Sequence, residues 1–126
     1  MIVGNDKITD NKNERKGLFI KTKKRVLDQA DILYIESMAK KVEIHTTGAD
    51  ESIEIYATMK ELEEQLGENF YRCHRTYIVN MAYITKYRRD CITLTNGDKI
   101  YVAKKRYHEF VKAYQCYLKD GKVSSI

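Results

Sequence analysis

Short runs of β-branched and aromatic residues, spread along most of the chain, constrain its fold more than any other feature of the sequence. Nine runs are predicted to be strands: 18–21, 32–36, 41–46, 53–57, 70–72, 77–79, 83–88, 91–95 and 99–102. Within 41–46, apolar Val42 and Ile44 alternate with charged or polar residues, which is typical of a strand with one buried face. No proline interrupts any run. The pattern therefore predicts a mostly β fold.

Two segments have helical periodicity instead. Thr58 and Glu61 form a capping-box pattern ahead of apolar residues on one helix face, and Gly67 follows as a stop signal. A second helix is predicted from apolar residues at i, i+3, i+4, i+7 and i+11, namely Tyr107, Phe110, Val111, Tyr114 and Leu118. Strands separate the two helices, so a helix-turn-helix, which needs consecutive helices, is not expected.

One turn type can also be predicted. Asn96–Gly97 stands between two predicted strands. Both residues tolerate positive φ, which indicates a two-residue type I′ hairpin.

The 126 residues are enough for one domain. Residues 1–17 are polar and are predicted to be a flexible tail or linker, residues 18–119 the domain, and residues 120–126 a C-terminal tail. A membrane-spanning run and a secretory signal are both absent from the sequence, so we expect a cytoplasmic protein.

The residues that could support catalysis or metal binding favour neither. Cys73, Cys91 and Cys116 are an odd number without CxxC spacing, so reduced thiols are expected rather than disulfides or a zinc site. Cys73 and His74 are adjacent in an extended segment, where side chains point to opposite faces and cannot easily pair for catalysis. We therefore expect no enzyme, cofactor or metal. His45 lies on a charged strand face and is expected to be solvated.

The charge is distributed unevenly along the chain. Residues 1–69 contain 11 Lys and Arg against 14 Asp and Glu, a net charge of −3, whereas residues 70–126 contain 12 against 4, a net charge of +8. Such asymmetry predicts a basic face built mostly by the second half. Nucleic acid is the first partner to consider and an anionic membrane surface the second, with an ordinary solvated surface as the alternative.

The segment 70–80, FYRCHRTYIVN, carries the most information. If Phe70 and 77–79 pack inward, then Arg72, His74, Arg75 and Thr76 crowd one short turn. Guanidinium, imidazole and hydroxyl groups there can donate to phosphate oxygens and base edges. A surface turn that contains arginines by chance is the alternative. Asn80 is expected to bond backbone rather than DNA.

This segment resembles the signature of the LytTR family, the DNA-binding domains of bacterial response regulators that control virulence, quorum sensing and bacteriocin production. The resemblance runs from about Leu18 to Leu118. Segments 32–37, 42–46, 58–66 and 96–107 resemble, in order, two early strands, the helix before the signature, and the final hairpin with the start of the last helix. The implied fold is an elongated arrangement of small antiparallel sheets with two short helices.

The resemblance also implies that three loops on one side of the sheets contact DNA, two in successive major grooves and one in the minor groove between them. Lys40, Arg75 and Lys105 are the expected base readers. Relatives usually have Ser-Arg near Ala103–Lys105, so Lys105 and Arg106 are interchangeable. The full set of expected DNA contacts is Lys40 and Lys41 in the first loop, Arg72, His74, Arg75 and Thr76 in the second, Lys104, Lys105 and Arg106 in the third, and Tyr101, Lys86, Arg88 and Arg89 as phosphate or rim contacts.

The expected function is sequence-specific binding of double-stranded DNA for bacterial transcription regulation, at paired repeat sites in promoters and with self-association on DNA. Single-stranded nucleic-acid binding through tyrosine stacking and non-catalytic protein interaction are the alternatives. Relatives in two-component systems usually carry an upstream receiver domain, which a 17-residue tail cannot form. The chain is therefore expected to be an excised C-terminal domain or a stand-alone regulator.

Overall fold

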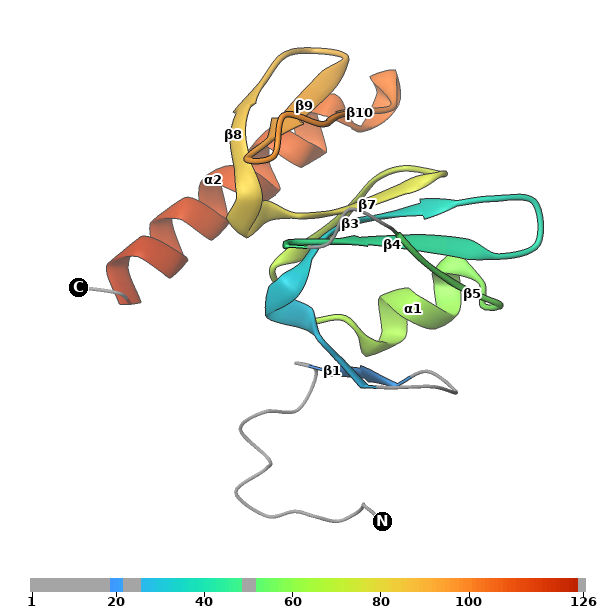
Figure 1. Ribbon diagram of the computed structural model, residues 1–126. Helices are drawn as coiled ribbons and strands as arrows, with labels where there is room; N and C mark the ends of the chain where they lie inside the picture. The colour runs from blue at the N-terminus through green and yellow to red at the C-terminus, as the bar shows by residue number, and fades with distance from the viewer. Residues whose placement is uncertain (1–18, 22–25, 49–51, 125–126) are drawn as a thin grey trace.

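The computed structural model describes residues 19–21, 26–48 and 52–124, and the predicted tail at 1–17 lies outside these residues. The elements within them, drawn in Figure 1, are β1 (Phe19–Lys21), β2 (Val26–Asp28), β3 (Ile32–Ser37), β4 (Val42–Thr46), β5 (Ile53–Ile55), α1 (Met59–Gln65), β6 (Phe70–His74), β7 (Tyr77–Asn80), β8 (Ile84–Tyr87), β9 (Cys91–Leu94), β10 (Lys99–Tyr101) and α2 (Tyr107–Ser124). In this part of the chain, no helix is long and apolar enough to span a membrane.

All strand pairs in the described residues are antiparallel. The central sheet has the order β5-β4-β3-β7-β6, a second sheet has the order β10-β9-β8, and β1 pairs with β2. This confirms the predicted mostly β architecture of small antiparallel sheets. Five strands lie between α1 and α2 in the chain, so the two helices do not form a helix-turn-helix.

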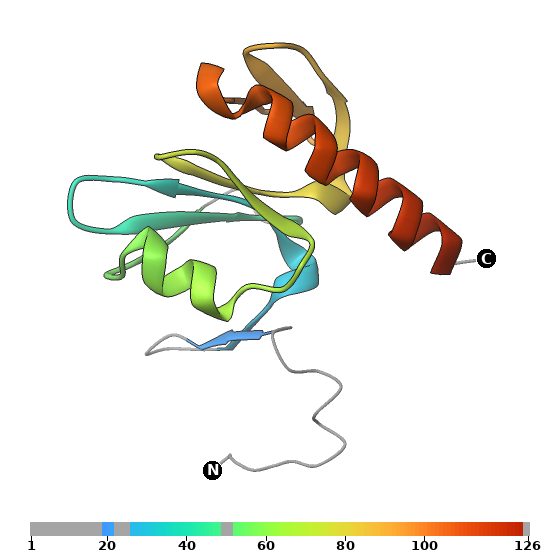
Figure 2. The ribbon, with the colours of Figure 1, turned by 180° about the vertical axis from the view of Figure 1, so that it is seen from behind.

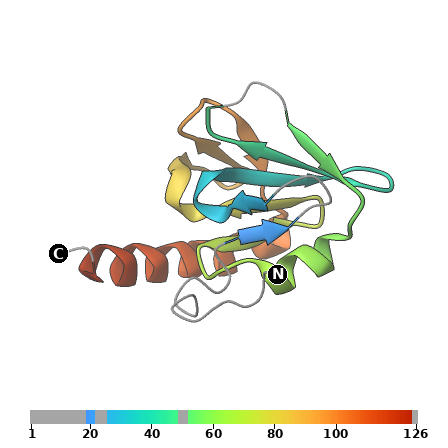
Figure 3. The same cartoon turned by 60° about the horizontal axis from the view of Figure 1, so that its bottom comes forward.

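The central sheet separates two hydrophobic cores, because successive side chains of a strand point to opposite faces. On one face, α1 and the β2 residue Leu27 pack over the sheet, and Figures 1 and 3 show β1 on this side too. On the other face lie β8–β10 and α2, which crosses obliquely in Figure 2. The first core is built from Leu27, Ile32, Ile35, Val42, Ile44, Met59, Leu62 and Ile78. The second contains Leu33, Tyr34, Cys73, Val79, Met81, Ile84, Ile92, Leu94, Ile100, Val102 and Phe110.

Helix α1 begins as the capping box predicts, and its C-terminal end is contacted by a side chain that is distant in the sequence. Thr58 Oγ1 accepts from the N–H of Glu61 at 3.0 Å, and Glu61 Oε1 accepts from the N–H of Thr58 at 2.8 Å. At the other end, the buried Gln29 amide donates to the carbonyl of Gln65 and accepts from the N–H of Gly67, both at 2.8 Å. A distant side chain thus satisfies backbone groups at the C-terminal end of the helix.

The hairpin between β9 and β10 differs from the prediction of a two-residue turn. The N–H of Gly97 donates to the carbonyl of Leu94 at 2.9 Å, and the N–H of Leu94 donates to the carbonyl of Asp98 at 2.9 Å. The loop therefore has three residues, 95–97, with Gly97 at φ +94°. A three-residue loop needs one residue in the left-handed region, whereas a type I′ turn needs two. Tyr34 Oη, whose pKa is raised by burial and by Asp98, donates to Asp98 at 3.1 Å and joins this loop to the central sheet.

Two further boundaries differ from the sequence prediction. Strand β2 was not predicted, because three residues with only Leu27 buried give almost no periodicity. Helix α2 continues past Leu118 to Ser124, so residues 120–124 of the predicted C-terminal tail are helical. Once a helix has formed, each added residue gains a backbone hydrogen bond at little cost, so its end is not fixed by the apolar pattern alone.

Asn80 acts as predicted from its residue type. Its side chain is 1% exposed, accepts from the N–H of Ala82 at 3.0 Å and donates to the carbonyl of Ile32 at 2.9 Å. The bond to Ile32 ties the end of β7 to the start of β3, and the bond from Ala82 caps the turn that follows β7.

Candidate nucleic-acid interface

The three predicted loops lie along one edge of the molecule. They are the β3–β4 turn (38–41), the β6–β7 turn (75–76) and η4 (Lys104–Arg106), a short 3-10 turn before α2. The N–H of Ser37 donates to the carbonyl of Thr76 at 2.8 Å, and the N–H of Ala103 donates to the carbonyl of Cys73 at 2.9 Å. Backbone hydrogen bonds therefore connect the middle loop to its neighbours on both sides, and all three lie at the right in Figure 1.

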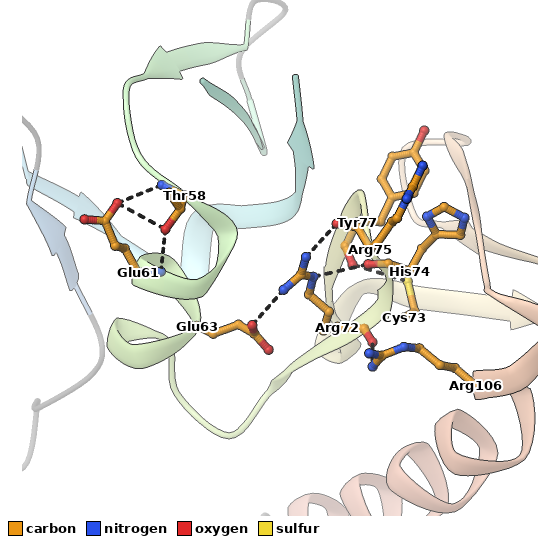
Figure 4. Close-up of polar contacts among 9 residues, drawn as sticks. All are labelled: Thr58, Glu61, Glu63, Arg72, Cys73, His74, Arg75, Tyr77 and Arg106. Atoms are coloured by element: carbon orange, nitrogen blue, oxygen red, sulfur yellow. Dashed lines mark hydrogen bonds and ion pairs between the residues drawn. The ribbon is translucent and has the colours of Figure 1, made fainter. Parts of the chain in front are cut away.

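Arg72 organises the middle loop (Figure 4). Its guanidinium donates to the carbonyls of His74 at 3.3 Å and Arg75 at 2.7 Å, and it pairs with Glu63 of α1 at 2.8 Å. A planar guanidinium suits this because its fixed fork serves several acceptors at once. Arg72 was predicted as a DNA contact, and in the structure its guanidinium is used within the protein to hold the turn.

His74 and Thr76 contact each other inside the same turn. Thr76 Oγ1 lies 2.8 Å from His74 Nδ1, and the N–H of Thr76 donates to that nitrogen at 3.2 Å. The His74 ring also meets Tyr77 edge-on, with ring centroids 6.0 Å apart. Both side chains are half-buried, so they shape the turn around Arg75.

Arg75 is exposed at the tip of this turn. Its carbonyl is held by Arg72, but its guanidinium has no carboxylate within ion-pair distance among the described residues. The backbone is therefore fixed while the charged group remains available to a ligand.

The third loop is attached to the middle one through Arg106, whose guanidinium donates to the carbonyl of Arg72 at 3.0 Å (Figure 4). Lys104 and Lys105 are exposed, and neither forms an ion pair with a described carboxylate. Of the two interchangeable candidates, Arg106 is thus the one engaged with the protein.

The first loop contains one paired and one unpaired cation. Lys41 Nζ lies 2.7 Å from Glu54 Oε1 of β5, and this hydrogen bond raises the pKa of Lys41 and lowers that of Glu54. The N–H of Met38 donates to the carbonyl of Lys41 at 2.8 Å and closes the turn. Lys40 is exposed and makes no ion pair within the described part of the chain.

The predicted rim residues lie on β8, in the β8–β9 turn and at the end of β10. The β8–β9 turn carries the exposed Arg88 and Arg89, and the carbonyl of its Asp90 accepts from the N–H of Val102 at 3.1 Å. Tyr101 is 60% exposed, just before η4. Lys86 is exposed on β8, which is separated from β10 by β9.

Cys73 is a core residue of the middle loop. Its thiol is fully buried and lies 3.5 Å from the carbonyl of Tyr101 and 3.9 Å from that of Tyr77. Burial raises its pKa to about 12, so the thiol stays protonated at neutral pH. A protonated thiol without a base is a poor nucleophile, and Nδ1 of the neighbouring His74 lies against Thr76.

The variant Cys73→Ser should lower the free energy of unfolding while leaving DNA affinity nearly unchanged. Because the Cβ–O bond is shorter than the Cβ–S bond, the serine hydroxyl reaches the carbonyls of Tyr101 and Tyr77 less well, and burying a hydroxyl without a good hydrogen bond costs roughly 1–3 kcal/mol. Urea unfolding and DNA titration of the same preparation check this. Loss of DNA binding by a variant that remains folded would show that Cys73 has a direct role.

Two residues that shape this edge were missed by sequence reasoning. Glu63 and Glu54 hold Arg72 and Lys41, respectively, and each comes from a different secondary-structure element than its partner. Neither pair lies at a spacing that predicts contact, so no sequence signal could have identified them. His45 was expected to be solvated, but it is half-buried: its side chain is 23% exposed and its ring stacks on Tyr34, with centroids 4.2 Å apart and planes 9° apart.

The sequence model of the LytTr DNA-binding domain family matches residues 22–115. No match is found among the curated proteins. A solved structure, the LytTr DNA-binding domain of a protein described as a methyl-accepting/DNA response regulator from Bacillus cereus, superposes with a TM-score of 0.64 at 23% identity. The similarity covers 75% of this chain and 93% of that one. At this identity the structural likeness supports the fold.

Proposed function

The chain belongs to the LytTR family of DNA-binding domains, and from this premise we propose that it binds double-stranded DNA sequence-specifically through the three loops at one edge of its sheets. The proposal extends to transcription regulation in the bacterial cytoplasm, at paired repeat sites in promoters. Self-association on DNA is part of the same proposal, and so is a phosphorylated upstream receiver domain if the chain is a fragment of a longer protein; the alternative is a stand-alone regulator.

One observation carries the proposal. Each of the three loops carries exposed cations that have no carboxylate partner among the described residues. Lys41 and Arg72, in contrast, are paired with Glu54 and Glu63. The cations without a described carboxylate partner are Lys40, Arg75, Lys104, Lys105 and Arg106, of which Arg106 donates to a backbone carbonyl. Cations that are not neutralised internally can replace the counterions of a phosphate backbone, which is the main source of affinity for DNA.

The contacts within the protein divide the predicted residues into two roles. Arg75, Lys40 and Lys105 make no ion pair with a described carboxylate and are proposed as base readers, Arg75 in the minor groove and the lysines in the flanking major grooves. Arg72, His74, Thr76 and Lys41 are proposed as positioning residues, because their polar groups already serve the turns. A pre-ordered loop loses less conformational entropy on binding.

Selection from a pool of random DNA duplexes, at roughly physiological salt because affinity depends on salt, tests the proposal. Enrichment of a short motif, especially in spaced copies, is the expected result. Retention without enrichment would reduce the domain to a nonspecific phosphate binder. Competition by single-stranded DNA of equal length tests the alternative that the domain binds single strands through tyrosine stacking. No retention at all would favour a protein-interaction module.

Arg88→Ala should weaken binding to all duplexes about equally. Arg88 lies in the β8–β9 turn beside the interface, where a phosphate contact is proposed. The slope of log K against log salt should become shallower by about 0.9, the value for one phosphate contact. Titrations at four salt concentrations on the selected site and on a scrambled duplex measure this. A change in base preference would contradict the proposed role.

A further inference from the structure

A cluster outside the DNA-binding loops joins one histidine and two glutamates on the hairpin β3–β4. In the strand register, Glu36 lies directly opposite Glu43 and Tyr34 opposite His45. His45 Nε2 lies 3.5 Å from Glu36 Oε1 and 3.7 Å from Glu43 Oε1. Like charges placed directly opposite each other in a sheet are destabilising unless a cation lies between them.

The imidazole nitrogen that faces these carboxylates is the unusual atom of the cluster. Nε2 of His45 is buried and has no hydrogen-bond partner among the described residues. Buried polar atoms in proteins nearly always have a hydrogen-bond partner, so a buried nitrogen that lies near two carboxylates without a hydrogen bond to either needs an explanation.

We propose that Glu36, Glu43 and His45 form a binding site for a divalent first-row transition metal ion, with Zn²⁺ as the fitting example. The three candidate ligand atoms all lie within 4.8 Å of one another. With Zn–N of about 2.0–2.1 Å and Zn–O of about 2.0–2.2 Å, tetrahedral ligands stand roughly 3.4 Å apart. The observed separations of 3.5 and 3.7 Å between the imidazole and the carboxylates match that spacing.

The surroundings orient two of the three ligands. The His45 ring is stacked on Tyr34, which fixes its plane, and Glu36 Oε2 accepts from the hydroxyl of Tyr77 at 3.5 Å. Outer hydrogen bonds of this kind hold metal ligands in place. The side chains of the three ligands are 20–31% exposed, so an ion and a water as fourth ligand can enter. One imidazole with two carboxylates favours zinc over the all-oxygen sites that magnesium and calcium prefer.

This site differs from the zinc sites that the cysteine count argued against, because it uses no thiol. It lies immediately behind the turn that carries Lys40, on the face of the sheet opposite α1. The proposal concerns metal binding alone and stands independently of the DNA sequence that the domain reads.

Calorimetric titration of the full chain with zinc chloride tests the site, together with the ring signals of its three histidines in NMR spectra. We expect one ion per chain and a shift of the His45 signals. Glu43→Gln, which keeps the shape of the side chain, and His45→Gln should each weaken binding at least tenfold, since even outer contacts of metal ligands are worth about 10–100-fold. Circular dichroism confirms that both variants are folded.

Two variants serve as matched controls. His108→Gln and Cys116→Ser remove exposed metal-binding groups on α2, away from the cluster, and should leave the zinc affinity unchanged. Zinc binding that survives both Glu43→Gln and His45→Gln, or that disappears with a control, would overturn the proposed site. An absence of heat together with unmoved His45 signals would overturn it as well.

Discussion

Replacing Arg75 by alanine should cost about 1–3 kcal/mol of binding free energy on the selected DNA site, or roughly 5- to 160-fold in Kd. Arg75 is exposed at the tip of the β6–β7 turn, and its side chain has no ion-pair partner among the described residues. The loss should be much smaller on a scrambled duplex, because a base reader contributes to discrimination. Fluorescence-anisotropy titrations on both duplexes measure the two losses.

The fold should tolerate Arg75→Ala, because the bond from Arg72 goes to the backbone carbonyl of residue 75 and not to its side chain. We expect the free energy of unfolding to change by no more than about 0.5 kcal/mol. Lys119→Ala, which removes an exposed cation from α2, is the matched control and should leave specific binding intact. Equal losses for Arg75→Ala on both duplexes would identify Arg75 as a phosphate contact.

Phe110→Ala should lower the free energy of unfolding by about 3–5 kcal/mol. Phe110 is fully buried and is the α2 residue in the second core, against which partly buried α2 residues also pack. Its ring lies 5.8 Å from Tyr71 of β6, 5.4 Å from Tyr87 of β8 and 5.8 Å from Tyr114, measured between centroids. A cavity among three aromatic rings cannot close fully, so the cavity adds to the lost transfer energy.

Urea unfolding followed by circular dichroism measures this loss. Lys112→Ala, two residues further along α2 and exposed, is the control and should stay within about 0.5 kcal/mol of the parent. Because domains of this size have only about 5–15 kcal/mol of stability, Phe110→Ala could leave a sizeable unfolded fraction. A loss below about 1 kcal/mol would mean that α2 does not depend on this ring for its packing.

Local patterns in the sequence were sufficient for most elements of the fold. The alternation in 41–46 predicted β4, and the pair Thr58 and Glu61 predicted the start of α1, because both signals act over a few residues. The turn that contains Arg75 was also predicted, since its apolar flanks and polar centre are adjacent in the chain. Strand β2, whose pattern is weak, was missed. The loop at Gly97 was given the wrong length although its Asn-Gly signal is strong, because a glycine at positive φ fits a three-residue loop as well as a two-residue turn.

The sequence patterns by themselves thus predicted the β-rich architecture, the two helices and the basic turn that contains Arg75, while the other two basic loops were predicted from the resemblance to the family. Only the tertiary structure decided which cations on those loops are free. Arg72 and Lys41 are held by Glu63 and Glu54, whereas Arg75 is not held by any described carboxylate. The tertiary structure also places His45 against Glu36 and Glu43. The physical reason is that hydrogen-bonding patterns and apolar periodicity act between near neighbours in the chain, while the pairing of charges depends on which elements the sheet order and core packing place side by side.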